Sequence, residues 1–572
     1  MSTTPRSILI SGFIAFLTVS SNLALAKHPK LDAELNTSDP NATVKVIVKV
    51  KKGTNERILS RMQVHHATHL TKLDLIDSHL VSIPVAELEQ LANEDDVEFI
   101  APDRQVRMTA YAGGPDYGWM VALGVNSTYG TLAYDGTGIG IAMLDTGIDP
   151  FADMKNSSGA SRIVYKQSFT GDNKPSDYHG HGTMVGGIMA GSGSKSNRSD
   201  GTYWVRGIAP NANIINLKVL NDSGVGTDSN VIAAITQAVA LKSTYNIRVL
   251  NLSLGRPIAS SYTSDPLCQA VQQAWNAGIV VVVAAGNEGR NNTKSTSGYG
   301  TIMSPANSPY VITVGAYNTS ATLPTGDDKM TSYSSKGPTN IDHIVKPDLI
   351  APGNRILSIR NQGSYLDKTY SNNLVPMTAY TTSGSGSASS YFQLSGTSFA
   401  APMVSGAAAL LIQKNPNLTP DQVKALLMKT ATKMAQGTTS AVDPVTGTQY
   451  LTQNDIFTVG AGLVNVPAAL ASSSVLSGSA LSPTAVYNSS NGQVTLQFVT
   501  GSNFVWGSGT VWGSNFVWGS NTLTSNNFVW GSNFVWGSST AAGFNFVWGS
   551  NFVWGSASDA IEAETVSING EN

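Results

Sequence analysis

The sequence predicts an α/β protein whose centre is a doubly wound parallel sheet. Within about residues 113–472, short runs rich in Val and Ile alternate with helical patterns, which is typical of a parallel sheet covered on both faces. A chain of 572 residues is also too long for one ordinary domain. We therefore expect a small α+β module before the sheet domain and a β-rich repeat tail after it.

The first 26 residues have the pattern of a secretory signal peptide. Arg6 precedes the mostly apolar run Ile8–Leu17, and Ala24–Ala26 offers a small-x-small cleavage site. A membrane anchor is the alternative, but polar residues interrupt the run, which falls short of the roughly 20 residues that a span needs. We predict cleavage after Ala26 and a secreted protein that is extracellular, periplasmic or attached to the cell surface.

Residues 27–112 predict a separate small module. Val44–Val50 alternates as a strand does, and Val97–Ile100 reads as a second strand. Between them, Asn55–His66 and Val85–Asn93 have helical patterns. These elements predict a unit of the βαβ type.

Residues 113–472 supply the elements of the main sheet. The predicted strands are Gly138–Leu144, Ile214–Leu220, Val249–Ser253, Ile279–Ala285 and Val311–Ala316, and helices are predicted at Asn230–Lys242 and Leu267–Ala277. A later helix should begin at Thr419, because Pro420 and Gln422 follow it as in a capping box.

The composition excludes some classes of partner. Charged residues make up 13% of the chain and the net charge is -2, so the chain lacks the basic field that nucleic-acid binding requires. Cys268 is the single cysteine, which rules out an intrachain disulfide. We expect it to be a packing residue at the start of a helix.

Three short motifs carry an Asp, a His and a Ser. Asp145 lies in Leu-Asp-Thr-Gly after a strand, His181 in Gly-His-Gly-Thr, and Ser398 in Gly-Thr-Ser-Phe-Ala-Ala-Pro. Hydrolysis of an acyl bond needs a nucleophile, a base and a carboxylate that orients the base. The chain order Asp, His, Ser is that of subtilisin.

These motifs resemble those of the subtilase family over about 360 residues. The resemblance implies a serine endopeptidase with Ser398 as nucleophile, His181 as general base and Asp145 as its orienting carboxylate. It also implies that residues 27–112 are an inhibitory propeptide, cut from the enzyme somewhere in Arg107–Gly114. The alternative is an N-terminal domain that stays attached.

The residues around the motifs support these assignments. Gly180 and Gly182 remove side chains beside His181 and so permit close approach, whereas His179 lacks the downstream Gly-Thr. Ser398 precedes an apolar helix rich in small residues, whose N-terminus would favour developing negative charge. We expect Pro402 to fall in the first turn of this helix, where proline is tolerated.

The family resemblance also implies an oxyanion donor and a substrate site. Asn287 matches the oxyanion asparagine and would act with the Ser398 backbone N–H. The substrate site consists of Ser253, Leu254 and Gly255, which would pair with extended substrate, and of Ala284, Ala285 and Gly286. The two segments together would wall the specificity pocket. Small uncharged walls predict broad specificity with an apolar preference. Ser304-Pro305 resembles a position where the family has a cis peptide bond.

Calcium is a second expectation from the family. Carboxylate and amide oxygens are the ligands that this ion prefers, and the candidates are Asp149, Asp153, Asn197 and Asp200. Solvated loop acids are an equally good explanation of these residues. The chemistry itself requires no cofactor.

The tail repeats the unit Asn-Phe-Val-Trp-Gly-Ser with a period of six between residues 501 and 556. Residues 473–500 would be a linker, and residues 557–572 a short end segment. An even period keeps Phe and Trp on one face of a strand. Three interpretations remain open: a small β-solenoid or hairpin stack, a segment for surface attachment or self-association, and a disordered tail that is removed. A surface-binding protein with an inert subtilase-like body is the alternative function.

Overall fold

The structure, a computed structural model, describes most of the chain between residues 28 and 497. Its described residues are 28–35, 39–108, 123, 133–197, 199–201, 203–293, 296–320, 325–382, 389–434, 437–473, 478–488, 493–497, 522–523 and 570–571. The predicted signal peptide and every Val-Trp-Gly-Ser unit of the tail lie outside these ranges. Each helix within them is too short or too polar to span a bilayer.

The N-terminal module is a four-stranded sheet with helices. Its elements are β1 (Thr43–Val50), α1 (Asn55–Val64), β2 (Thr68–Leu73), η1 (Asp74–Ile76), β3 (Ser78–Pro84), η2 (Val85–Glu87), α2 (Leu88–Ala92) and β4 (Val97–Pro102). The strands lie in the order β2-β3-β1-β4, and β1 runs antiparallel to both β3 and β4. The βαβ-type unit predicted from the sequence is therefore wrong in its pairing.

Two strands of the module escaped the sequence analysis for identifiable reasons. Strand β2 is an edge strand whose side chains are mostly exposed, so it has little apolar alternation. Strand β3 is buried along most of its length, but it begins with Ser78 and His79, which are not typical of a buried strand. Strand β3 lies between β2 and β1 and runs antiparallel to both. A βαβ unit, which has no such strand, therefore does not describe the module.

The main domain is built on an eight-stranded, mostly parallel sheet. Its strands are β6 (Gly140–Asp145), β7 (Ile163–Ser168), β8 (Asn213–Lys218), β10 (Ile247–Leu252), β12 (Val280–Ala284), β13 (Ile312–Asn318), β14 (Lys329–Met330) and β15 (Leu349–Pro352). The path is β14-β13-β12-β10-β6-β8-β7, with β15 beside β13 and only β14 antiparallel. The predicted doubly wound α/β class is confirmed.

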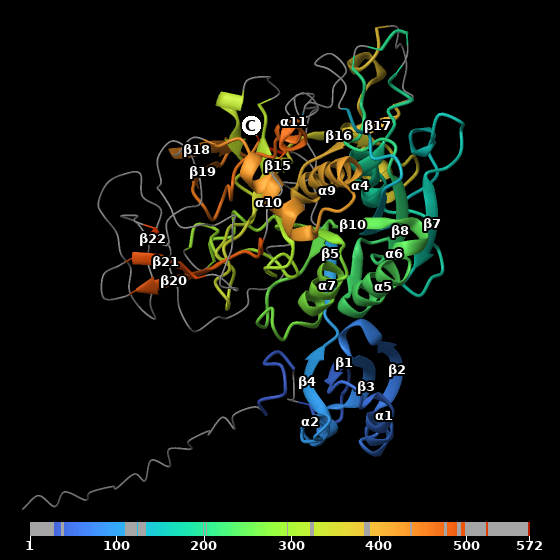
Figure 1. The fold of residues 1–572 in the computed structure, drawn as a ribbon, viewed down its shortest axis with the longest axis vertical. Coiled ribbons are helices and arrows are strands. Elements are labelled where there is room, and N and C mark those ends of the chain that lie inside the picture. Colours follow the sequence, from blue (N-terminus) through green and yellow to red (C-terminus); the bar gives the residue numbers. More distant parts are fainter. Residues whose placement is uncertain are drawn as a thin grey trace, which may run out of the picture.

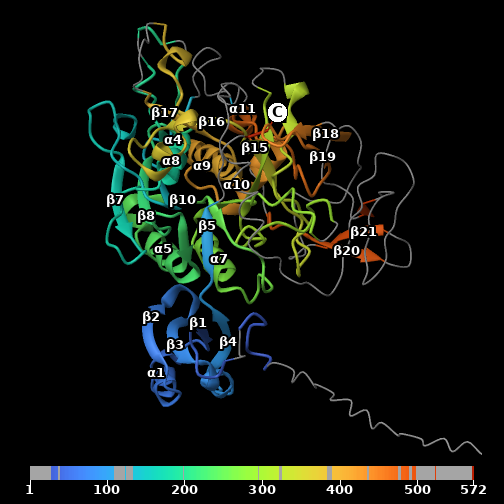
Figure 2. The same cartoon turned by 180° about the vertical axis from the view of Figure 1, so that it is seen from behind.

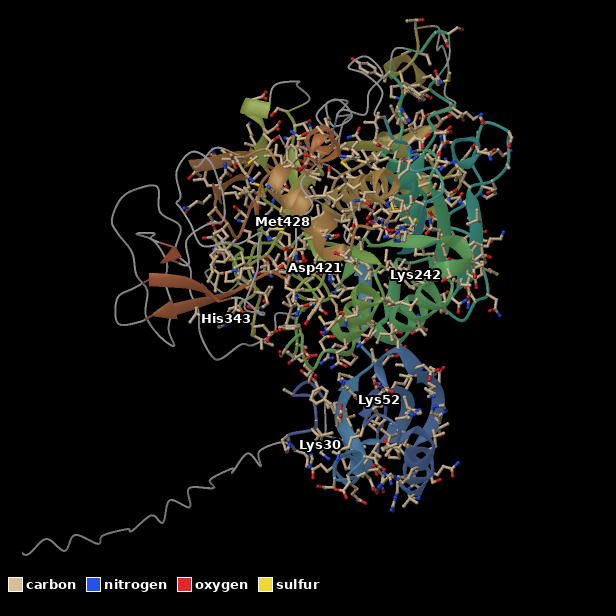
Figure 3. The ribbon with its side chains drawn as sticks, viewed as in Figure 1. Lys30, Lys52, Lys242, His343, Asp421 and Met428 are labelled. Atoms are coloured by element: carbon tan, nitrogen blue, oxygen red, sulfur yellow. The ribbon has the colours of Figure 1, made fainter. Side chains whose placement is uncertain are left out.

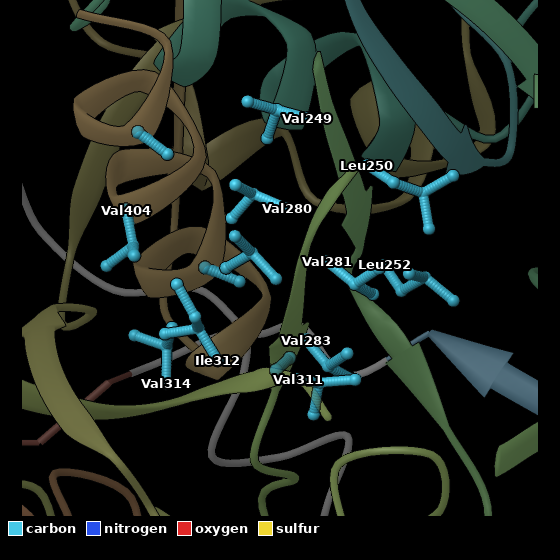
Figure 4. Close-up of a cluster of buried hydrophobic side chains, with 14 of the residues drawn as sticks. Val249, Leu250, Leu252, Val280, Val281, Val283, Val311, Ile312, Val314 and Val404 are labelled. Atoms are coloured by element: carbon cyan, nitrogen blue, oxygen red, sulfur yellow. The ribbon is translucent and has the colours of Figure 1, made fainter. Parts of the chain in front are cut away.

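Helices cover both faces of this sheet. The principal ones are α4 (His181–Ala190), α5 (Asp228–Ala240), α7 (Pro266–Asn276), α9 (Thr397–Lys414) and α10 (Pro420–Thr430). Figure 4 shows how alternate residues divide between the faces: Val280 and Ile312 point toward Val404 of α9, whereas Leu250 and Val281 point to the other side. This alternation with apolar residues on both faces explains the continuous Val-rich runs in the sequence.

The module packs against one end of the main domain, below α5 and α7 in both views (Figures 1 and 2). Ile47, Leu73, Ile76 and Leu80 of the module belong to the same cluster of buried apolar side chains as the main core. Asp103 accepts hydrogen bonds from the backbone N–H and the hydroxyl of Ser229, both at 2.8 Å, in the first turn of α5. The module is thus joined to the domain by apolar packing and by a helix cap.

The remaining elements lie around the sheet. They are β16 (Ile356–Ile359), α8 (Tyr365–Thr369), β17 (Tyr391–Leu394), β18 (Gly437–Val442), β19 (Gln449–Asn454), α11 (Val466–Ala471), β20 (Thr484–Asn488), β21 (Gln493–Gln497) and β22 (Thr522–Leu523). The capping box predicted at Thr419 is present at the start of α10.

Part of the segment predicted as a linker is packed on the domain. Asp421 of α10, labelled in Figure 3, accepts the backbone N–H of Ala480 at 2.6 Å. The hydroxyl of Ser482 donates to Asp348 at 2.6 Å and accepts from Lys424 at 2.8 Å, all three being buried. Residues 478–488 therefore contribute buried contacts to the domain before the repeats begin.

Candidate active site

The functional residues meet at the carboxyl edge of the sheet. Strands β12, β10 and β6 are neighbours and run parallel. Asp145 ends β6, Ser253 follows β10, and Asn287 follows β12. This edge is where open α/β sheets bind their ligands. Asp145, Ser253 and Asn287 lie near one another because the three adjacent strands that precede them end at this edge.

Asp145 and His181 form a buried hydrogen-bonded pair. The Nδ1 atom of His181 lies 2.6 Å from Oδ1 of Asp145, and both side chains are fully buried. The backbone N–H of Thr146 donates to the same oxygen at 2.8 Å. A carboxylate on Nδ1 keeps the proton there and leaves Nε2 as the basic nitrogen. Among the described residues, Nε2 has no hydrogen-bond partner.

The glycines beside His181 permit this close approach. A Cβ on Gly182 would collide with the carbonyl oxygen of Gly147 and lie 3.1 Å from Oδ1 of Asp145. Gly180 has φ +107°, in the left-handed region that favours glycine. His179, the alternative base, instead lies beside Tyr365, with ring centroids 5.4 Å apart, and burial lowers its pKa to about 4.

Asp177 organises the His181 loop, a role that the sequence analysis missed. Its Oδ1 accepts from the Thr146 hydroxyl at 2.8 Å and from the Gly180 N–H at 2.7 Å, while Oδ2 accepts the Thr183 N–H at 2.8 Å. One buried carboxylate thus ties the Asp145 loop to the first turn of α4. An acidic residue four positions before the histidine was the available signal, since acidic groups favour helix N-termini.

Ser398 lies in the first turn of α9, where backbone N–H groups have no intrahelical acceptor. Its Oγ donates to the carbonyl oxygen of Ser253 at 3.0 Å. Catalytic hydrogen bonds commonly tighten only when substrate is bound. The predicted role of Ser398 as nucleophile would therefore require its hydroxyl to turn from Ser253 toward Nε2 of His181.

The sequence analysis placed Pro402 in the first turn of α9, and the structure shows that this is wrong. The helix begins at Thr397, so Pro402 is its sixth residue. Proline there cannot donate to the carbonyl four residues earlier, which is that of Ser398. The hydroxyl of Ser253 donates to this carbonyl instead, at 2.8 Å. Ser253 thereby joins the segment predicted to pair with substrate to helix α9, which carries Ser398.

Two hydrogen bonds orient the side chain of Asn287, the predicted oxyanion donor. Its Oδ1 accepts both the backbone N–H and the hydroxyl of Thr397, each at 3.0 Å. These two bonds fix the orientation of the amide, so Nδ2 is directed away from Thr397. Nδ2 is buried and unpartnered within the described part of the chain. A buried donor left unpaired is costly, and an oxyanion that forms during catalysis would satisfy it.

A strand of the N-terminal module lies against the segment that the sequence analysis assigned to substrate pairing. Strand β5 (Gln105–Met108) pairs antiparallel with β11 (Leu254–Gly255) on one side and with β9 (Val225–Thr227) on the other. Gly255 is opposite Arg107, and Leu254 is opposite Met108. An extended peptide therefore occupies the position that the sequence analysis assigned to substrate.

Met303 is a further residue of this region that the sequence analysis did not identify. A Cβ on Gly255 would lie 3.0 Å from Cβ of Met303, and one on Gly286 would lie 2.8 Å from its Cγ. Its N–H donates to the carbonyl of Ala285 at 3.1 Å. Met303 thus contacts both predicted walls, Ser253–Gly255 and Ala284–Gly286. The adjoining Ser304-Pro305 bond is cis, as expected.

The calcium candidates do not assemble into a ligand set. Asp153 accepts from the Ser194 hydroxyl at 2.6 Å and from the Tyr391 hydroxyl at 2.9 Å, so protein donors use both of its oxygens. Oδ2 of Asp149 accepts from Asn361 at 3.2 Å. Across the described ranges, no three His, Cys, Asp or Glu side chains are grouped to hold a metal ion. A calcium site stays a prediction without assigned ligands.

Comparisons with known proteins identify the relatives of this chain. The profile of the Subtilase family matches residues 136–456. Serine protease AprX of Bacillus subtilis is 41% identical over 303 residues, which are 51% of this chain and 61% of that protein. Subtilisin DY of Bacillus licheniformis is 33% identical over 337 residues, which are 59% of this chain and 92% of that protein.

A solved structure supports the fold. The crystal structure of fervidolysin from Fervidobacterium pennivorans, described as a keratinolytic enzyme related to subtilisin, aligns with a TM-score of 0.55 at 22% identity. The alignment covers 78% of this chain and 63% of that one. This likeness concerns the fold. The family profile and the relatives show that this chain belongs to the subtilase family of subtilisin-like serine peptidases.

Proposed function

We propose that this protein is a secreted serine endopeptidase that hydrolyses peptide bonds and is made as a self-processing precursor. The observation that carries the proposal is the set of Asp145, His181, Ser398 and Asn287 at one sheet edge, beside a peptide strand held between β9 and β11. The predicted signal peptide supports secretion.

The residues divide the reaction as follows. Ser398 Oγ attacks the peptide carbonyl and its proton passes to Nε2 of His181, which later returns it to the leaving amine. Asp145 holds Nδ1–H and stabilises the imidazolium. Asn287 Nδ2 and the Ser398 backbone N–H stabilise the oxyanion. Water then attacks the acyl-enzyme, and the same base activates it.

The N-terminal module is proposed as the inhibitory propeptide. Strand β5 fills the substrate-pairing position, and the module buries apolar side chains against α5 and α7. Pairing runs Gly255 with Arg107 and Leu254 with Met108, so the next enzyme residue is Ser253, whose carbonyl oxygen is bonded to Ser398. On the module, the residue that follows Met108 is Thr109, which would come opposite Ser253. Cleavage is therefore predicted after Thr109, inside the stretch Arg107–Gly114.

Broad specificity with an apolar preference is proposed for the mature enzyme. It is supported by walls of Ala, Gly and Leu at the predicted pocket and by the adjacent flexible side chain of Met303. Asp or Glu side chains are not among the residues assigned to these walls.

The test is digestion of a defined mixture of peptides by the purified full chain, beside its Ser398→Ala variant. We expect the wild type to cut internal bonds, mostly after uncharged residues, and the variant to cut none. Equal cutting by both would contradict the assignment of Ser398. A folded wild type that cuts nothing would favour the surface-binding alternative.

A further inference from the structure

Two residues beyond the repeats are buried in the catalytic domain. Gly570 and Glu571 are the last described residues, and both are buried. In Figures 1 and 2 this end of the chain lies beside β15 and β18. The N-terminal module is at the opposite end of the domain, so this contact is separate from the one that β5 makes.

The side chain of Glu571 is held by a complete set of donors. Its Oε2 accepts from Nη2 of Arg290 at 2.9 Å and from the Ser332 hydroxyl at 2.5 Å, and its Oε1 accepts the Ser332 N–H at 2.8 Å. The exposed fractions of the Arg290 and Glu571 side chains are 3% and 1%. Charge-assisted bonds of this kind are stronger than neutral ones, so the site selects a carboxylate.

Arg290 is fixed in place for this role. Its Nε donates to the Ser332 hydroxyl at 2.7 Å, and its Nη1 donates to Asp443 at 2.6 Å. Its guanidinium also lies 4.1 Å from the ring centroid of Tyr450, a favourable cation–π distance. The arginine is therefore preorganised, with one edge left for the carboxylate of Glu571.

The backbone at this site is recognised as well. Asn354 accepts the N–H of Glu571 at 3.1 Å and donates to its carbonyl oxygen at 3.0 Å. Gly570 has φ +61°, and a Cβ there would lie 2.9 Å from Oγ of Ser395 and 3.0 Å from Oδ1 of Asn354. A larger residue at 570 would be strained and crowded.

We propose that Arg290, Ser332 and Asn354 form a binding site for an acidic Gly-Glu peptide segment, occupied here by Gly570 and Glu571 of the same chain. We call this contact the Gly-Glu clasp. It attaches the chain downstream of the repeats, while residues 478–488 attach it upstream. The repeats are thus retained on the enzyme between two anchored points, and the site would take a Gly-Glu peptide in trans when the clasp is open.

Emptying the clasp would leave buried groups without partners. The Ser332 N–H and both polar atoms of the Asn354 amide are bonded to Glu571, and unpaired buried groups of this kind destabilise a fold. Arg290 is also three residues after Asn287. The clasp therefore stabilises the loop that carries the oxyanion donor, although it does not touch the catalytic residues.

Hydrogen exchange of the full chain tests the clasp independently of catalysis. All proteins carry Ser398→Ala, and Glu571→Gln is compared with Glu564→Gln, which makes the same charge change upstream. We expect exchange in peptides covering Ser332 to accelerate about tenfold or more in Glu571→Gln alone. Unchanged exchange in Glu571→Gln, or equal acceleration in both variants, would overturn the proposal.

Binding in trans tests the ligand chemistry. The probe is a labelled peptide of residues 565–572, added to the Ser398→Ala chain from which residues 569–572 are deleted. We expect it to bind at least about tenfold more tightly than peptides with Gln for Glu571 or Ala for Gly570. Equal binding of the three peptides, or none by a folded deletion variant, would overturn the proposal. If the deletion unfolds the protein, the exchange experiment decides.

Discussion

The N-terminal module and the Gly-Glu clasp both attach a flanking segment to the catalytic domain, but through different interactions. Strand β5 is held by backbone pairing with β9 and β11 and by apolar packing of its module. The clasp is held by the buried carboxylate of Glu571, which Arg290 and the Ser332 N–H bind, and by the amide of Asn354, which binds the Glu571 backbone.

This difference has a functional meaning. Backbone pairing accepts many sequences, so any extended peptide could replace β5 once the module leaves. The clasp depends on a particular pair of residues and lies away from the nucleophile. The first contact suits a segment that gives way to substrate, and the second suits a segment that is retained.

Asn287→Ala should have the largest effect, which falls on catalysis, and therefore on removal of the N-terminal module, and not on the clasp. Loss of the oxyanion donor is expected to lower kcat by about 10²–10³-fold, the size known for a subtilisin asparagine in this role. Removal of the module and hydrolysis of an added peptide should slow together. Initial rates measure this, with the exposed Asn292→Ala in the same loop as control. A drop smaller than a few-fold would contradict the role of Asn287.

Asp103→Ala should weaken docking of the module without altering the chemistry. It removes the two bonds to Ser229 in the first turn of α5, and lost helix caps cost about 0.5–2 kcal/mol. Inhibition by the cleaved module should weaken by about 2- to 30-fold, seen as higher activity immediately after processing. The exposed Asp95→Ala serves as control. Equal activity of the two variants would show that the cap does not contribute.

Acidic pH should destabilise the module through His79. Burial, reinforced by the neighbouring His69, lowers the pKa of His79 to about 4, whereas an unfolded histidine titrates near about 6.5. Between these values the unfolded module binds a proton that the folded one does not, so stability present above pH 6.5 is lost as the pH falls toward 4.

Thermal unfolding of the Ser398→Ala precursor measures this effect. The transition of the module should move to lower temperature between pH 7 and pH 4.5, and His79→Gln should reduce the shift. A transition that is independent of pH in both proteins would contradict the assignment to His79.

The sequence predicted the catalytic centre because local motifs determine it. Asp145, His181, Ser398 and Asn287 each follow a strand or begin a helix, and Val-rich runs identify those strands. Parallel strands then bring their carboxyl ends to one edge without further information. The family comparisons and the observed fold confirm a subtilisin-like peptidase domain, while the roles of these four residues stay a prediction.

Other features depend on contacts that are distant in sequence. Nothing local marks Met303 as the neighbour of Gly255 and Gly286, and Gly570-Glu571 resembles any polar chain segment. Strand β3 escaped notice because its buried Ser78 and His79 are polar. Pro402 was misplaced because the start of α9 is hard to recognise in the sequence. The N-cap residue is Gly396, and glycine marks an N-cap only weakly.

The central claim is that Ser398 removes the N-terminal module while the chain is retained through the clasp. Intact-mass analysis of purified precursor, wild type beside Ser398→Ala, tests it most directly. We predict that only the wild type loses the module, with a new N-terminus after Thr109 or elsewhere within Arg107–Gly114, and that its product still contains Gly570 and Glu571. Processing of both proteins or of neither, or a product that lacks residues 570–571, would contradict the account.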